Sequence, residues 1–178
     1  MKFENKLIRL AFFTAFAVSV YVLDTLIPKP LPFMRLGLAN IVVLLLLLAN
    51  DLSSAIVVTF AKTIIGGFFS GALISPTTIL SLSGGAFAIL VMYLAMKSII
   101  PFSIIGISVC GAVIHNITQI VLVRFILIKS TTIFYLTPLL IILGIATGII
   151  TGYLTYLIQE RFMQDGNELI IKEFKGNV

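Results

Sequence analysis

The stretch RLGLANIVVLLLLLAND, residues 35–51, places an arginine, a glycine and an asparagine at the entrance to an unbroken apolar run. Such a run is typical of a helix that crosses a membrane. Of the 178 residues, 60% are hydrophobic and only 11% are charged, which lies far outside the range of soluble proteins. The sequence therefore predicts an all-α integral membrane protein.

Apolar runs of this kind recur along the whole chain, and crossing a hydrocarbon core of about 30 Å takes roughly 20 helical residues. The spacing predicts six spans, at about 7–27, 36–49, 53–69, 79–96, 103–128 and 133–158. Spans two and three are short, so a tight hairpin that dips partway into the membrane is the alternative. We expect one transmembrane domain over 1–178, a six-helix bundle whose tail starts at 159.

Basic residues outside the spans predict the orientation of the bundle. Six spans place seven of them on the side of the termini: Lys2, Lys6, Arg9, Lys97, Arg161, Lys172 and Lys175. Three fall on the other side: Lys29, Arg35 and Lys129. The positive-inside rule then places both termini in the cytoplasm of a cell-membrane protein. The net charge of +5 thus reflects topology and contact with membrane lipids, so we expect no nucleic acid partner.

Several function classes lack their motifs in this sequence. There is no GxxxxGK[ST] loop for ATP phosphates, so any ATP must be used by a partner protein. There is no Asp-rich cluster that would hold Mg²⁺ against a prenyl diphosphate. The lone Cys110 and lone His115 leave no metal-binding set and no supported catalytic triad. We expect no enzyme activity, no metal and no cofactor.

Polar residues inside the apolar runs are the candidate binding groups, because each is costly in a membrane and commonly faces a cavity or a partner. Lys62 lies in the middle of VTFAKTIIGG. His115, Asn116 and Gln119 lie in GAVIHNITQ, where His115 and Gln119 share one helical face. These donors suit an anionic or strongly polar ligand.

Structural roles are the alternative for each of these residues. Lys62 can form an ion pair with Asp24 of the first span. His115 and Gln119 can hydrogen-bond helices to one another, and Arg124 can reach the outer interface with its long side chain. The sequence leaves both alternatives open.

Small residues at four-residue spacing mark close helix contacts. Gly144, Gly148 and Gly152 form one such series, which serves either the bundle core or a dimer. In the fourth span, SLSGG contains Ser83 and Gly84 and offers a polar backbone patch to a ligand.

Three blocks carry a family resemblance: RLGLANI after the proline-rich loop, SPTTILSLSGG and GAVIHNITQ. Over most of the chain they resemble the family labelled heptaprenyl diphosphate synthase component I or Gx transporter. That family is similar in architecture to the six-helix S components of energy-coupling factor (ECF) transporters. The resemblance implies a subunit that captures a small molecule and works with an ECF-type coupling protein and ATPases. Ala11 and Ala15 match the first-span AxxxA surface that docks on the coupling protein.

The resemblance also implies a binding site. In S components the loop between the first two spans closes over the ligand, which makes Arg35 a gate or anion contact; the alternative is that Arg35 anchors its helix at the headgroups. The expected binding set is Arg35, Asn40, Lys62, Ser83, Gly84, His115, Asn116 and Gln119. We expect a small ligand that is anionic or isoprenoid-related. The older family name implies the alternative function, a non-catalytic membrane subunit of a prenyl diphosphate synthase.

Overall fold

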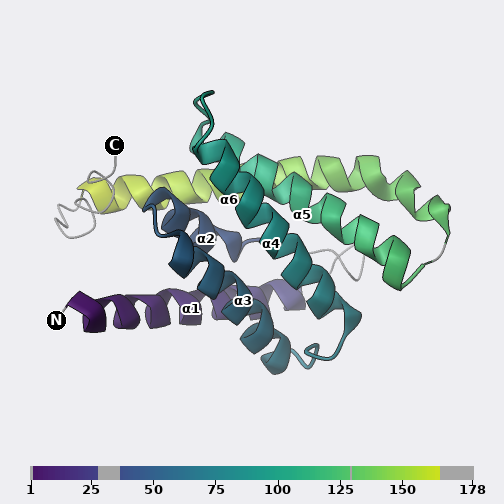
Figure 1. The fold of residues 1–178 in the computed structure, drawn as a ribbon, viewed down its shortest axis with the longest axis horizontal. Helices are drawn as coiled ribbons and strands as arrows, with labels where there is room; N and C mark the ends of the chain where they lie inside the picture. Colours follow the sequence, from purple (N-terminus) through teal and green to yellow (C-terminus); the bar gives the residue numbers. More distant parts are fainter. Residues whose placement is uncertain (1, 28–36, 129, 165–178) are drawn as a thin grey trace.

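The computed structural model describes residues 2–27, 37–128 and 130–164, which form a bundle of helices (Figure 1). The helices are α1 (Lys2–Leu26), α2 (Asn40–Leu48), α3 (Leu52–Phe69), α4 (Pro76–Met96), α5 (Ile104–Ile126), the 3-10 helix η1 (Thr131–Leu136) and α6 (Thr137–Gln164). Five helical segments are long and apolar enough to cross a membrane: α1, α3, α4, α5, and η1 together with α6. The chain is therefore a multi-pass helical membrane protein.

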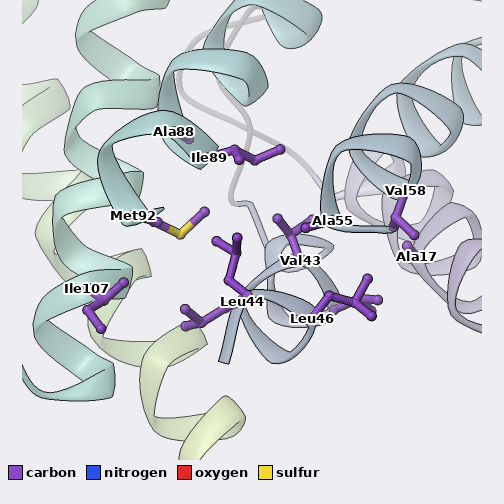
Figure 2. Packing of buried hydrophobic residues seen from close by; sticks show 12 residues of the cluster. Ala17, Val43, Leu44, Leu46, Ala55, Val58, Ala88, Ile89, Met92 and Ile107 are labelled. Carbon is purple, nitrogen blue, oxygen red and sulfur yellow. The ribbon is translucent and has the colours of Figure 1, made fainter. Parts of the chain in front are cut away.

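Helix α2 is not the span predicted at 36–49. It has nine residues, so it is about 14 Å long and covers less than half of a hydrocarbon core of about 30 Å. Residues 42–47 are all buried, and α2 contacts α1, α3, α4 and α6. Figure 2 shows Leu44 of α2 facing Met92 and Ile107 in the resulting apolar cluster. The prediction of six spans is therefore not confirmed, because the apolar run belongs to a short helix enclosed by the others.

A tight turn joins α2 to α3 at Asn50 and Asp51, where the sequence predicted a break. Asn50 adopts a left-handed conformation with φ of 55°. Its N–H donates to the carbonyl of Leu47 at 2.8 Å, and the N–H of Asp51 donates to that of Leu46 at 3.0 Å. This pattern is the Schellman motif that ends many helices. The Asp51 carboxylate then accepts from the N–H of Ser54 and caps α3, so the two helices form a hairpin.

The two described ends of the chain lie at the same end of the bundle (Figure 1). Lys6 and Arg9 in α1 form ion pairs with Asp51 of the α2–α3 turn. Lys97, which follows α4, donates to Asn50 of the same turn at 3.1 Å. Helix α6 returns alongside α5 and continues to Gln164, past the predicted start of the tail at 159.

Glycines of α6 allow it to pack directly on the backbone of α5. A Cβ added at Gly148 would lie 2.6 Å from Cα of Val109, and one at Gly152 would lie 2.7 Å from Cα of Ile105. Gly144 makes a similar approach, with an added Cβ 3.1 Å from Cα of Val113. The predicted glycine series therefore serves packing inside the bundle, and its use for a dimer is not needed to explain it.

We predict that Gly148→Val lowers the free energy of unfolding by about 1–3 kcal/mol, because the added side chain forces α6 away from α5. Ala146→Val is the matched control, since Ala146 is exposed on the same helix two residues earlier. Thermal unfolding followed by circular dichroism in a non-ionic detergent measures both. Equal melting temperatures for the two variants would contradict this packing.

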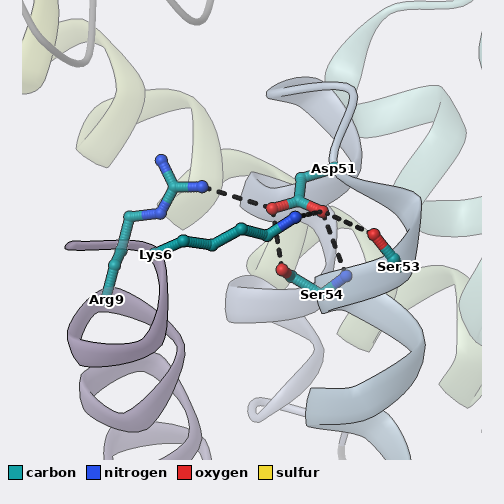
Figure 3. Close-up of polar contacts among 5 residues, drawn as sticks. All are labelled: Lys6, Arg9, Asp51, Ser53 and Ser54. Carbon is teal, nitrogen blue, oxygen red and sulfur yellow. Dashed lines mark hydrogen bonds and ion pairs between the residues drawn. The ribbon is translucent and has the colours of Figure 1, made fainter. Parts of the chain in front are cut away.

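Asp51 holds the start of α1 against the α2–α3 hairpin (Figure 3). Its carboxylate lies 3.2 Å from the Arg9 guanidinium and 3.6 Å from Nζ of Lys6. The hydroxyls of Ser53 and Ser54 donate to it at 3.0 and 2.7 Å. Burial raises the pKa of Asp51, but the hydrogen bonds from Ser54 and Ser53 and the charge of Lys6 outweigh burial, so the pKa lies below the usual 3.8. The ionised form is therefore favoured by folding.

We predict that Asp51→Asn lowers the free energy of unfolding by about 1 kcal/mol at pH 7, because Asn retains the helix cap but loses both ion pairs. Since folding lowers the pKa of Asp51, its stabilisation is complete above pH 3.8 and is lost as the pH falls through the lower, folded-state pKa. The difference between parent and variant should therefore vanish on acidification. A difference that is constant down to pH 2.5 would show that the charge of Asp51 does not hold α1.

Candidate functional site

Two small cavities adjoin each other at the start of α2, in the interior of the bundle. One is lined by Gly37, Asn40, Met92, Ser108, Ala112, His115, Asn116, Thr147 and Thr151. The other is lined by Tyr21, Asp24, Gly37, Ala39, Asn40, Lys62, Thr63, Ser81, Gly85 and His115. They measure about 10 and 20 Å³, and each has room for about one water molecule. Every long helix contributes at least one polar side chain to them.

Asn40 of α2 and Lys62 of α3 are in contact at the start of α2. Asn40 is the first residue of α2, and its side-chain oxygen accepts a hydrogen bond from Nζ of Lys62 at 2.5 Å. Gly37, three residues earlier, has φ of 76°, a conformation that favours glycine. The backbone N–H of Asn40 donates to the carbonyl of Gly37 at 2.8 Å. This turn brings non-helical backbone and a buried ammonium to one point inside the bundle.

His115 reaches the cavities because α4 has no side chain at Gly84. A Cβ added at Gly84 would lie 2.9 Å from the imidazole ring. Gly85 leaves the same kind of space for Thr59, where an added Cβ would lie 2.8 Å from the Thr59 methyl group. The SLSGG motif therefore provides room for neighbouring side chains.

Two hydrogen bonds made by side chains that line the first cavity connect α5 to α6. The side-chain amide of Asn116 donates to the carbonyl of Leu140 at 2.9 Å. The hydroxyls of Ser108 and Thr151 share a hydrogen bond of 2.8 Å. Both bonds lie between buried residues, and helix-to-helix hydrogen bonds of this kind are ordinary in membrane bundles. Asn116 therefore has a structural partner, whatever else it contacts.

Among the residues that the structure describes, buried polar atoms without a hydrogen-bond partner include both amide atoms of Gln119, Oγ of Ser81 and Oγ1 of Thr59. Gln119 is 1% exposed and Ser81 is 4% exposed. A buried polar group without a partner costs about 1–3 kcal/mol. Such groups are therefore candidates for contact with a ligand or with water.

The predicted binding residues are partly brought together by the fold. Asn40, Lys62, His115 and Asn116 line the cavities, and Gly84 contacts His115. Gln119 is buried one turn from His115 on α5, outside the cavity lining. Ser83 is half-buried and does not line either cavity. Arg35 lies outside the described residues.

The structure adds polar cavity residues that were not in the binding set predicted from the sequence: Tyr21, Asp24, Thr63, Ser81, Ser108, Thr147 and Thr151. Asp24 had a usable signal, since it is the lone acid within a predicted span. Ser81 belongs to the SLSGG motif, from which the predicted binding set took Ser83 and Gly84. Arg124, in the last turn of α5, contributes to neither cavity.

A family model described as heptaprenyl diphosphate synthase component I matches residues 13–158. The chain belongs to the heptaprenyl diphosphate synthase component I family. The match covers α2, both cavities and all of α3, α4 and α5. No curated protein and no solved structure matches the chain.

The cavities of this component I protein offer several kinds of hydrogen-bonding group. Its cavities combine one ammonium, one carboxylate, one imidazole, amides and hydroxyls. Within residues 2–27, 37–128 and 130–164, no three His, Cys, Asp or Glu side chains gather in a group able to hold a metal ion. The arrangement can hold a polar group by several hydrogen bonds in a water-poor interior.

We predict opposite effects for two neighbouring amides of the component I protein. Asn116→Leu removes the bond to Leu140 and should lower the free energy of unfolding by about 1–2 kcal/mol. Gln119→Leu removes an amide without a partner and should raise it or leave it unchanged. Thermal unfolding of both variants in one detergent makes the comparison. A loss of stability in Gln119→Leu as large as that in Asn116→Leu would assign Gln119 a structural role.

Proposed function

We propose that this protein is a membrane-embedded substrate-capture subunit for a small molecule that is anionic or isoprenoid-related. The observation that carries the proposal is the polar cavity at the start of α2, to which α1, α3, α4 and α5 also contribute. Ionisable groups inside a membrane are costly and commonly mark a substrate or ion pathway. Lys62 is 5% exposed, its Nζ donates to Asn40, and the charge of Asp24, which lines the same cavity, acts on it.

Capture requires a separate source of energy, because the sequence has no phosphate-binding loop. We propose that an ECF-type coupling protein and its ATPases supply it. In this arrangement both termini lie in the cytoplasm of the cell, and the α2–α3 turn with Lys6, Arg9 and Lys97 lies on the same side. The gathering of these basic residues at one end supports that orientation.

The outer face of α1 is the proposed docking surface for the coupling protein. Ala11 and Ala15 are exposed on this helix, and Phe12 and Phe16 beside them are 67% and 48% exposed. Small residues allow another helix to approach closely, and the flanking rings add contact area. Tyr21 and Asp24 of the same helix line the cavity, so a partner on this face would contact a helix that forms part of the cavity wall.

The second candidate is a non-catalytic membrane subunit that associates with a prenyl diphosphate synthase. The family description favours it, because it names a synthase component. This second candidate function predicts stable association with a soluble synthase. It does not predict a small molecule bound in the cavity.

We predict that mass spectrometry of small molecules extracted from the detergent-purified protein finds a retained compound. The double variant Asn40→Ala/His115→Ala should retain at least about tenfold less, because each residue removed would contribute a hydrogen bond inside the bundle. Ser83→Ala is the matched control, since Ser83 lies on α4 but outside the cavity lining. An empty parent protein that co-purifies with a prenyl diphosphate synthase would overturn capture and favour the second candidate.

A further inference from the structure

The start of α2 is a source of positive potential in the interior of the bundle. The positive end of a helix carries about half an elementary charge. At α2 no side chain caps this end, and the N–H groups of Asn40 and Ile41 are taken by the carbonyls of Gly37 and Leu38. The start of α2 therefore contributes positive potential to the cavity. Because the N–H groups of Asn40 and Ile41 are already bonded, hydrogen bonds to a ligand come from side chains.

Lys62 supplies donors at this point. Its ammonium carries three N–H groups, and Asn40 accepts from it at 2.5 Å. The side chain is 5% exposed, so solvent water has little access to the other two N–H groups of the ammonium. Nζ of Lys62 and the end of α2 therefore face the same cavity, which Asp24 also lines.

Ser81 provides the independent indication of a ligand. It lines the cavity together with Lys62 and Asn40, is 4% exposed, and its Oγ has no hydrogen-bond partner. A hydroxyl can donate one hydrogen bond, and a buried hydroxyl without a partner is costly. Because Ser81 and Lys62 line the same cavity, an acceptor oxygen placed there suits both donors.

We infer that this cavity binds one compact, singly charged anionic group, a carboxylate, between Nζ of Lys62, Oγ of Ser81 and the start of α2. The cavity measures about 20 Å³, close to one water molecule, so a carboxylate oxygen enters by replacing water, whereas a diphosphate requires the helices to separate. The carboxylate of Asp24 lines the same cavity and repels anions, so a ligand group with one negative charge is favoured over a group with two. The inference rests on the proposed function and narrows its substrate to a monocarboxylate-bearing molecule.

Anion titrations of the full-length protein in a non-ionic detergent test the inference, with sodium acetate, sodium chloride and inorganic pyrophosphate as probes. The melting temperature of the parent should rise saturably with acetate. Lys62→Met should need at least about tenfold more acetate for the same rise, and Ser81→Ala about three- to tenfold more. Lys97→Gln, which removes a lysine at the end of α4, should respond as the parent does.

Asn40→Asp provides a variant that keeps the fold. Its carboxylate still accepts from Lys62 and lies in the first turn of α2, where negative charge is favourable. The empty variant should therefore melt at or above the temperature of the parent, and it should lose the response to acetate because its own carboxylate occupies the site. This result remains available if Lys62→Met does not fold.

Three outcomes would overturn the inference: equal acetate responses in the parent, Lys62→Met and Asn40→Asp; saturation by pyrophosphate at lower concentration than by acetate; or saturation by chloride alone, which would assign a site for a free inorganic anion. Extraction and mass spectrometry separate the two proposals. A retained compound without a carboxylate supports capture and overturns the inference. A saturable acetate response in a protein that retains and transports nothing supports the anion site and overturns capture.

Discussion

In a hydrocarbon core every backbone N–H and C=O needs a partner within the protein, and this constraint decides where α2 can lie. The backbone of residues 37–39 is not helical, and α2 itself is too short to cross the membrane. Such a segment is stable only where protein surrounds it, and α2 is in contact with α1, α3, α4 and α6. Both cavities lie where this segment enters α2, at Gly37 and Asn40.

The buried polar residues divide into two sets according to their partners. Asn116, Ser108 and Thr151 are occupied in joining α5 to α6, at bonds that the glycine-mediated contact of these helices makes possible. Gln119 and Ser81 are equally buried but gain no bond in return. Packing accounts for the first set, whereas the second set reduces stability unless it meets water or a ligand.

Length and composition were sufficient to predict the long helices, because a span needs a long apolar run and little else. The span predicted at 53–69 is found as Leu52–Phe69, and the Ser75-Pro76 break became the start of α4. The run before Asn50, predicted as a span, forms the short helix α2, and its sequence could not distinguish the two because leucine and valine suit lipid and protein surroundings equally well. Within α4, the binding set included Ser83, whereas Ser81 lines the cavity; two residues differ by about 200° around a helix, and the sequence did not fix how α4 is rotated.

Helix α1 connects the surface of the molecule with the cavity. It is the least buried of the five long helices, yet it contributes Tyr21 and Asp24 to the cavity wall. Tyr21 fits against Gly66 of α3, where a Cβ would collide with its ring, and Asp51 holds the start of α1 through Lys6 and Arg9. These contacts lie on the α3 side of α1 and at its start, which leaves Ala11 and Ala15 bare. Because α1 has both this exposed face and two residues of the cavity wall, a displacement of α1 would open the cavity on the side of Tyr21 and Asp24.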